Sequence, residues 1–533
     1  MRKLSLILAL ALTLTMCAFG PIAQAADEPV VLTWYYDLTY QETNWGEDEI
    51  SREFTDRTGI ALDMSKAQSG DSQQLNLMMA AGDLTDLVCV HTDSTTRTMM
   101  RDSGMFMEFK PLIDKNCPEY WDRMGENYWK YWSSPIDGKN YFHANCTFTE
   151  LTSPKYLGFG PWNATTLVRN DIYDEIGRPD MTSPQAFIDV LAQVKDAYPD
   201  IMPFFTGNNS EFALLSGYTQ FGFYQRALGI ERFYEDETGH LKAPIQDPKY
   251  VDFVKWLNKL YQAGIITRES FTYTEDQRNS IRDGGNVFAY NDNSSDVGRV
   301  PAGASDTFFE AVPPWPTMKM TQQTGMSWMS MFISNTCKDP DAAIQFINYS
   351  SSADGDILLQ WGIEGRDWVY DDNGNPHVPE ETVARRQADW IGYVQESGYR
   401  AYNFGINFAD HVVEYYTFTS NPMLKDVWEM NKNYCFAKLY MMSNDPDAGT
   451  MEAILYQQVN DEFRRRFADV VLAASEDEAV AEFEKLKEDL YAMDLAMVEA
   501  AWDQKAQRTK DIFGADNCVF YGIGMEGYMH QYD

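Results

Sequence analysis

Motifs for covalent and metal chemistry are scarce in this 533-residue chain. It has 6 His and 7 Cys, with no Cys pair at C-x-x-C spacing and no H-E-x-x-H, G-x-S-x-G or G-x-x-x-x-G-K-[ST] motif. These absences argue against common zinc, hydrolase and nucleotide sites. One dinucleotide-like match, Gly522–Gly527, has no following helix or strand, so chance explains it. We expect a protein that is not an enzyme, with no catalytic residue, cofactor or metal.

A short loop, Asp371–Asn375, gathers the oxygen-bearing side chains that calcium prefers. Tight turns use the same residue types. The loop lacks the Gly at position six and the Glu at position twelve of a calcium-binding loop. We therefore interpret the segment as a turn.

Positive charge is also in short supply. Lys and Arg number 43 against 80 Asp and Glu, which gives a net charge of -37. Such an excess argues against nucleic acid and anionic lipid as partners. The acidic residues are scattered along the chain, a pattern typical of a solvated surface.

Only one long hydrophobic run is present. Leu4–Met16 follows the basic Met1-Arg2-Lys3 and is too short to span a bilayer comfortably, so residues 1–25 are predicted to be a signal peptide. Two processing routes are open: ordinary cleavage before Ala26, or lipidation at Cys17, where Leu14–Cys17 resembles a lipoprotein box. We expect an exported, extracytoplasmic protein, either secreted or periplasmic or a cell-surface lipoprotein.

What the sequence does contain is a strong α/β pattern near its start. Leu75, Met78, Met79 and Gly82 fall at helical spacing, and the compact apolar run Leu87–Val90 follows as a buried strand. Upstream, Asn44 and Glu47 are spaced to cap a helix that Gly59 ends. Cys89 is interpreted as a core residue of the strand. The length predicts more than one core.

These segments resemble a known family. Phe54–Ile60 and Leu75–Val88 are similar to the opening of the family 1 extracellular solute-binding proteins, the carbohydrate receptors of bacterial ABC importers. Leu167–Phe187 resembles the same family's strand, Arg-x-Asp turn and Thr-capped helix. The box Gly362-Ile-Glu-Gly365 and the turn that follows resemble its peptide-lipoprotein-like branch.

The resemblance implies an α/β, two-lobed periplasmic-binding-protein-like fold of type II. Each lobe is expected to be a mixed sheet flanked by helices, followed by a helical C-terminal region. Lobe 1 would comprise residues 26–157 and 295–360, and lobe 2 residues 158–294 and 361–533. Hinges are expected at the crossovers near Phe159–Asn163 and Tyr290–Asp296.

Aromatic residues support a sugar-binding cleft, with 14 Trp, 31 Tyr and 30 Phe. Sugar rings stack on aromatic planes, and their hydroxyls need polar partners. In open α/β sheets ligands bind beyond the carboxyl ends of strands. By that rule and the family boxes, the expected ligand-binding residues are Trp34, Tyr36, Thr92, Asp93, Trp162, Arg169, Tyr290, Asn291, Trp328, Glu364 and Trp368.

Structural roles compete with each of these assignments. Strand faces alternate, so the core claims at least one aromatic residue of the first strand, and Trp328 is as readily half-buried core. Arg169 could simply pair with Asp171. A salt bridge to Arg366 or another Arg is the structural alternative for Glu364.

We expect a monomeric receptor that captures an oligosaccharide or related polyhydroxylated solute and delivers it to the transmembrane subunits of an ABC permease. Two other functions stay open at this stage. One is an exported glycan-active enzyme with Asp93 and Glu364 as a carboxylate pair. The other is a sugar sensor for a membrane kinase.

Overall fold

The structure, a computed structural model, describes residues 28–36, 43–64, 72–91, 94–144, 164–207, 212–215, 220–321, 329–370, 376–399, 401–402, 422–431, 434–441, 444–447 and 449–521. The predicted signal peptide, the anchor position Cys17 and the turn Asp371–Asn375 lie outside these ranges. Within them, every helix is too short or too polar to span a lipid bilayer.

A first, five-stranded sheet is built mainly from the N-terminal part of the chain. Its order is β2-β1-β3-β12-β4, from β1 (Val30–Tyr36), β2 (Ile60–Asp63), β3 (Leu87–His91), β4 (Phe142–Ala144) and β12 (Met329–Ile333). The first three strands are parallel, and β12 runs antiparallel between β3 and β4. The helices of this part are α1 (Glu49–Thr58), α2 (Ser72–Ala81), α3 (Ser94–Asp102), α4 (Phe109–Asn116), α5 (Glu119–Met124), α6 (Glu126–Trp132), α12 (Pro340–Ser350) and α13 (Ala353–Trp361).

The α2–β3 segment forms as the sequence predicts. Leu75 of α2 is buried, and Gly82 ends the helix with a positive φ of 67°. The N–H of Asp83 donates to the carbonyl of Met78 at 3.0 Å, which turns the chain toward the strand. Cys89 is fully buried in β3, as expected.

The cap of α1 differs from the prediction. Asp48 is the N-cap, and its Oδ1 accepts from the N–H of Ser51 at 2.8 Å. Asn44 instead donates to the Glu47 side chain at 3.1 Å, outside the helix. Carboxylates at the N-cap accept the otherwise orphaned first-turn amides, and Asp48 stands one residue before the helix. Gly59 ends α1 in the left-handed conformation, as predicted.

A second, four-stranded sheet has the order β10-β5-β9-β6, from β5 (Ala164–Arg169), β6 (Met202–Phe205), β9 (Val287–Asn293) and β10 (Phe309–Val312). Its helices are α7 (Asn170–Glu175), α8 (Pro184–Ala197), α9 (Gln220–Ala227), α10 (Tyr250–Gln262) and α11 (Glu275–Asp283). Shorter elements of this part are β7 (Tyr234–Glu235), β8 (Leu241–Lys242), η2 (Pro244–Gln246), η3 (Arg268–Phe271) and η4 (Ser294–Asp296). Ser183, rather than Thr182 of the expected Thr-capped helix, caps α8, and Pro184 occupies its first turn.

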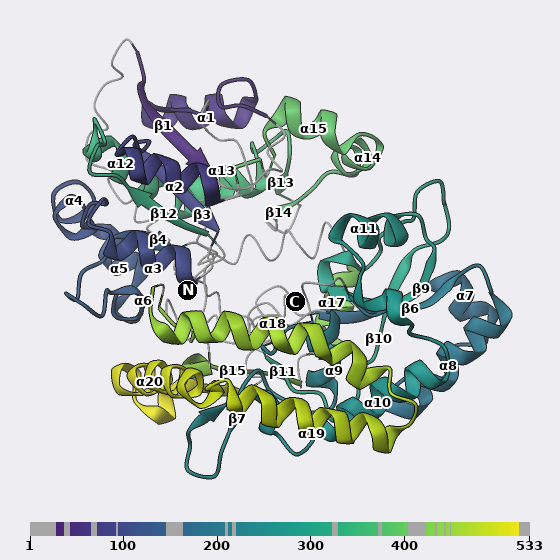
Figure 1. The fold of residues 1–533 in the computed structure, drawn as a ribbon. Coiled ribbons are helices and arrows are strands. Elements are labelled where there is room, and N and C mark those ends of the chain that lie inside the picture. Colours follow the sequence, from purple (N-terminus) through teal and green to yellow (C-terminus); the bar gives the residue numbers. More distant parts are fainter. Residues whose placement is uncertain are drawn as a thin grey trace, which may run out of the picture.

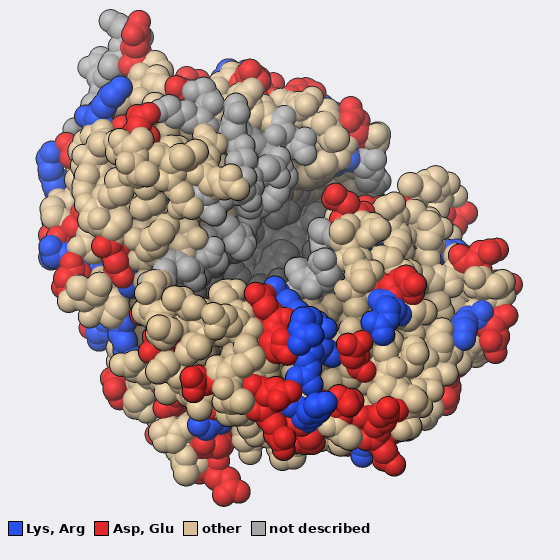
Figure 2. All heavy atoms as spheres, viewed as in Figure 1, with Lys and Arg blue, Asp and Glu red and all other residues tan. Residues whose placement is uncertain are grey.

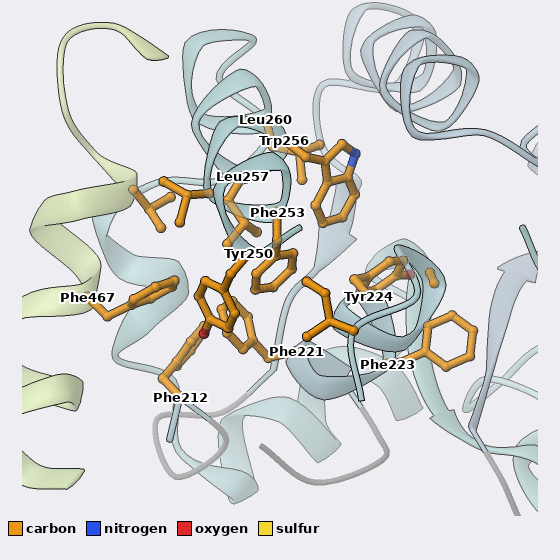
Figure 3. Packing of buried hydrophobic residues seen from close by; sticks show 14 of the residues in the cluster. Phe212, Phe221, Phe223, Tyr224, Tyr250, Phe253, Trp256, Leu257, Leu260 and Phe467 are labelled. Carbon is orange, nitrogen blue, oxygen red and sulfur yellow. The ribbon is translucent and has the colours of Figure 1, made fainter. Parts of the chain in front are cut away.

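Aromatic side chains fill the core beside this sheet. Figure 3 shows rings from α9 and α10 packed together, with Phe467 approaching from a third helix. Tyr224 stacks on Trp256 with centroids 5.1 Å apart, and Phe221 meets Phe467 edge-on at 5.4 Å. Such pairs stabilise a core by about 0.5–1.5 kcal/mol beyond burial. Many of the chain's aromatic residues therefore serve the core.

The C-terminal region is helical, as expected. It comprises α18 (Met451–Val471), α19 (Glu476–Ala492), α20 (Leu495–Phe513), η6 (Leu439–Met441), η7 (Ala515–Cys518) and a small sheet of β11 (Met320–Thr321), β15 (Cys435–Lys438) and β16 (Val519–Tyr521). Helix α18 packs on α19 and α20, while α19 contacts α10 and α20 contacts α6. Figure 1 shows these helices running along the base of the view, beneath both sheets. They connect the two halves of the molecule.

The segment after α13 contains β13 (Val369–Tyr370), β14 (Pro376–His377), α14 (Glu380–Ala388), α15 (Trp390–Ser397) and α17 (Pro422–Asn431). Its first part packs beside the first sheet, where α15 contacts α1. Helix α17 instead contacts η4 of the second half, and Figure 1 draws it beside the second sheet. The expected lobe boundaries, with 361–533 in lobe 2, stay a prediction.

Candidate functional site

The two main sheets present edges that the chain itself connects. In the first sheet, β3 ends at His91, which is paired with Met329 at the start of β12, and β4 ends at Ala144 on the same edge. In the second sheet, Asn293 at the end of β9 pairs with Ala164 at the start of β5. The chain leaves the first edge after Ala144 and enters the second at Ala164. A crossover therefore links the two edges.

These edges border a hollow. Figure 1 places the first sheet at upper left and the second at right, with α18 below both. In Figure 2 the same face is hollowed between these two parts, and acidic side chains are scattered over it. Because β1 and β3 point their carboxyl ends to this edge, the arrangement is that of a ligand cleft between two α/β lobes.

Four of the expected ligand-binding residues, Thr92, Asp93, Trp162 and Trp328, lie outside the described residues. All four belong to segments that directly adjoin the strand ends of this cleft. The separation of the Asp93 and Glu364 carboxylates is thus outside the described structure. Their assignment to ligand binding stays a prediction.

The aromatic residues expected on β1 pack in the interior. Trp34 is 0% exposed and Tyr36 3%. The Trp34 ring lies 6.1 Å from those of Tyr36 and Phe346. This packing gives both side chains a core role at the end of β1, and a role in binding stays a prediction.

Tyr290 and Asn291 of β9 are also buried, at 2% and 1% exposed. The Tyr290 ring meets Phe309 edge-on at 4.9 Å, and its hydroxyl donates to Asp296 at 3.5 Å. Burial is the main cause that raises the pKa of Tyr290 above its ordinary value, and the Asp296 charge adds to it. Asn291 Nδ2 donates to the carbonyl of Thr165 at 2.8 Å, which ties β9 to β5.

A buried ion-pair network surrounds the end of β9, and no sequence motif predicts it. Arg282 of α11 contacts Asp292 at 3.3 Å and Asp296 at 3.4 Å, and Arg278 also pairs with Asp292. Arg299 closes the network on Asp296 at 2.8 Å. The four groups Arg278, Arg282, Asp292 and Asp296 are only 10–12% exposed. The network thus anchors α11 at the expected Tyr290–Asp296 hinge.

Arg169 pairs with Asp171 through two hydrogen bonds, at 3.0 and 2.5 Å. Its third nitrogen donates to the carbonyl of Gly285 at 2.6 Å. Burial raises the pKa of Asp171, but the Arg169 hydrogen bond and backbone N–H groups outweigh it, so the pKa lies below the ordinary value. The Arg-x-Asp turn therefore has the structural contact that the sequence left open.

Glu364 and Trp368 occupy different environments, although they are joined by a β-bridge. Trp368 is 3% exposed, meets Trp361 edge-on at 5.1 Å and donates from Nε1 to the carbonyl of Gly362 at 3.1 Å. Glu364 is exposed, and among the described residues it forms no ion pair. Arg366 instead pairs with Glu49 and Asp367.

The neighbouring strand β13 marks where this box lies. Figure 1 places β13 and β14 on the side of the first half that faces α11 and the second sheet. An exposed carboxylate in this region is available to hydrogen-bond the hydroxyls of a bound solute. Among the expected ligand-binding residues that the structure describes, Glu364 is the one that is exposed.

His143 on β4 is a buried titratable group near the first edge. It is 0% exposed, and its Nδ1 contacts the hydroxyls of Tyr120 and, at 3.5 Å, Tyr128. Burial lowers the pKa of His143 to about 3, with a contribution from the Arg123 charge. The imidazole is thus neutral and structural. Across the described ranges, no group of three His, Cys, Asp or Glu side chains is placed to hold a metal ion.

A family model described as bacterial extracellular solute-binding protein matches residues 49–359, more than half of the chain. No curated protein sequence matches. Among solved structures, the alginate-binding protein AlgQ2 without calcium ion is 16% identical, with a TM-score of 0.65, 90% of this chain covered and 99% of that one.

The Streptococcus pneumoniae ABC-transporter substrate-binding protein FusA, in complex with kestose, is 18% identical with a TM-score of 0.65 and the same coverage of both chains. An S. pneumoniae N-glycan transport solute-binding protein with Man1GlcNAc is 15% identical with a TM-score of 0.54, again covering 90% and 99%. At these identities the likeness shows the shared two-lobed fold.

Proposed function

Because the chain belongs to the bacterial extracellular solute-binding protein family, we propose that it captures an oligosaccharide, or a related polyhydroxylated solute, between its two lobes. It then delivers that solute to the transmembrane subunits of an ABC permease. The observation that carries the proposal is the pair of facing sheet edges, joined by the crossover between Ala144 and Ala164. Solutes bind beyond such strand ends in α/β folds.

The neighbours support the class of ligand. Proteins with the same fold include an alginate-binding protein, a substrate-binding protein in complex with kestose and an N-glycan transport protein in complex with Man1GlcNAc. For this chain, the exposed carboxylate of Glu364 suits sugar hydroxyls. Thr92, Asp93, Trp162 and Trp328 stand on the segments that adjoin the cleft, and we assign them to the ligand as well.

Closure of the cleft follows from the same arrangement. Contacts made only when both lobes touch the ligand favour the closed state by a hinge motion. We place the hinges at Phe159–Asn163 and Tyr290–Asp296. The receptor acts as a monomer outside the cytoplasm, and the permease binds its closed form.

A thermal-shift and calorimetry panel of oligosaccharides tests the function. A true ligand at about 100 times its Kd stabilises the folded state by about 2.7 kcal/mol. Saturable stabilisation by one glycan class, with the glycan recovered intact by chromatography, is the expected result. Cleavage of the glycan would show that the protein is a glycan-active enzyme rather than a receptor. No stabilisation by any glycan of the panel would refute sugar binding.

The form in which the protein is exported needs its own measurement. We propose removal of residues 1–25, with a free N-terminus at Ala26, as one route and a lipid tether at Cys17 as the other. Mass spectrometry of the mature N-terminus from the producing cell distinguishes them. A chain that still starts at Met1 would contradict both.

A further inference from the structure

A second cavity, of about 490 Å³, lies between α3 and α6 on one side and α18 and α20 on the other. Apart from Phe142 of β4, its lining residues in the described part of the chain belong to helices and connecting segments. Its volume lies within the roughly 300–1,000 Å³ usual for small-molecule sites. We call it the α3–α20 pocket.

The lining charge is the reverse of the whole chain's. Its cations are Arg97, Arg101, Lys505 and Arg508, whereas only two carboxylates, Asp447 and Glu452, line it. The whole chain carries 43 basic against 80 acidic residues. A local excess of cations in so acidic a protein indicates a site for an anion.

Arg101 and Lys505 have carboxylate partners. Arg101 binds Asp102 through two hydrogen bonds, at 2.7 and 2.8 Å, and Lys505 contacts Asp447 at 2.8 Å. Arg508 differs, since its described contact is a donation to the carbonyl of Ser133 at 3.3 Å and no described carboxylate forms an ion pair with it.

Arg508 also sits in an unfavourable field. Burial lowers the pKa of Arg508 below its ordinary value, and the charge of Arg101 lowers it further, while the Asp447 charge acts in the opposite direction. The two guanidinium groups repel each other although Asp102 pairs with Arg101, and an anion in the cavity would reduce that repulsion. A carboxylate accepts two parallel hydrogen bonds from such a group.

The remaining walls suit a ring rather than a bare ion. Tyr131, Trp132 and Phe142 supply aromatic surface, and Arg97 lies 4.6 Å from the centre of the Trp132 ring. Gln504 and Asn444 add amide groups to the lining. Aromatic surface with planar amides is the chemistry that holds a hydroxylated ring.

We propose that the α3–α20 pocket is a second ligand site that takes a small sugar acid, with Arg508 on its carboxylate. The ligand would touch α3 and α6 of the first half and α18 and α20 of the C-terminal region together. Its binding would therefore hold these two parts at one relative position.

The test uses the full mature chain with D-galacturonate, D-galactose and sulfate as probes in calorimetry. We expect D-galacturonate to bind saturably, with no response to D-galactose and at least tenfold weaker binding of sulfate. Arg508→Gln should weaken D-galacturonate binding at least tenfold. Equal binding of sulfate and D-galacturonate would overturn the sugar-acid assignment, and no binding of either would overturn the site.

Two further variants separate the pocket from general effects. Ala501→Phe fills the cavity without altering charge and should abolish D-galacturonate binding. Arg465→Gln removes an exposed cation elsewhere on α18 and should leave the affinity unchanged. An equal loss with Arg465→Gln would show that net charge alone is responsible. Binding of a neutral oligosaccharide should survive Arg508→Gln, so failure here is distinct from failure of the cleft.

Discussion

The hydroxyl of Tyr402 donates a hydrogen bond to the carboxylate of Asp48, the N-cap of α1. Both residues are buried, at 1% and 0% exposed. One carboxylate thus caps a helix of the first half and fixes a segment more than 350 residues later. This relationship ties the region after α15 to the opening of the fold.

Loss of that carboxylate should destabilise the protein more than loss of an ordinary cap. Asp48→Ala removes the bond to Ser51 and leaves the Tyr402 hydroxyl buried without its acceptor, so we expect about 2–4 kcal/mol lower unfolding free energy. Thr450→Ala, at the more accessible cap of α18, should cost about 1 kcal/mol. Urea unfolding checks both, and equal losses would contradict the linking role of Asp48.

His143 predicts how stability changes in mild acid. Its folded pKa of about 3 lies below the ordinary 6.5, so the unfolded chain binds a proton that the folded chain refuses. The free energy of unfolding should therefore fall as the pH drops from 6.5 toward 3, by about 1.4 kcal/mol per pH unit from this group. Above pH 6.5 the contribution is constant.

The variant His143→Leu should show a shallower fall in stability between pH 6.5 and 5 than the wild type. Tyr120→Phe removes a hydrogen-bond partner but leaves the imidazole buried, so its slope should match the wild type. The slopes are measured by urea unfolding at several pH values. If the free energy of unfolding falls with the same slope in His143→Leu and in the wild type, His143 does not contribute to the loss of stability in acid.

The network at the end of β9 should depend on its central carboxylates. Asp296→Ala removes one carboxylate partner from the buried Arg282 and from the partly exposed Arg299, while Asp283 still pairs with both, and we expect about 1.5–3 kcal/mol lower stability. Glu462→Ala, which breaks pairs with the exposed Arg465 and with Arg466, should cost under about 1 kcal/mol. Thermal unfolding compares the two, and a loss under 1 kcal/mol for Asp296→Ala would show a dispensable network.

The box around Glu364 allows binding and packing to be separated. Glu364→Gln keeps the shape of an exposed side chain, so the melting temperature should stay unchanged while the Kd for the oligosaccharide rises at least tenfold. Trp368→Phe loses the bond to Gly362 and part of the Trp361 contact, and should lower stability by about 1–2 kcal/mol. If calorimetry gives an unchanged Kd for Glu364→Gln, Glu364 does not bind the oligosaccharide.

Local sequence patterns predicted much of the fold. The spacing of Leu75 and Gly82 and the apolar run of β3 predicted α2 and β3 correctly, because helix periodicity and glycine termination act within a few residues. The predicted N-cap of α1, Asn44, was wrong. Asn44 and Asp48 can both accept hydrogen bonds from first-turn amides, and the tertiary contact with Tyr402 favours Asp48.

The site was harder to predict because it depends on contacts between distant residues. Tyr290 is an expected ligand-binding residue at a strand end, and its contacts with Phe309 and Asp296 could not be predicted from the sequence, so its role in binding stays a prediction. The α3–α20 pocket had no sequence signal at all, since Arg101 and Arg508 are four hundred residues apart and meet only through the packing of α20 against α6. The exposure of Glu364 could not be predicted either, because Arg366 pairs with Glu49 and Asp367 instead of Glu364.

The position of β12 sets the order in which the molecule can be completed. This strand lies between β3 and β4, yet all four strands of the second sheet precede it in the chain. Until Met329–Ile333 has been made, β3 and β4 have no neighbour to join them, and closing so long a loop is slow. The N-terminal sheet therefore stays incomplete while most of the chain is synthesised.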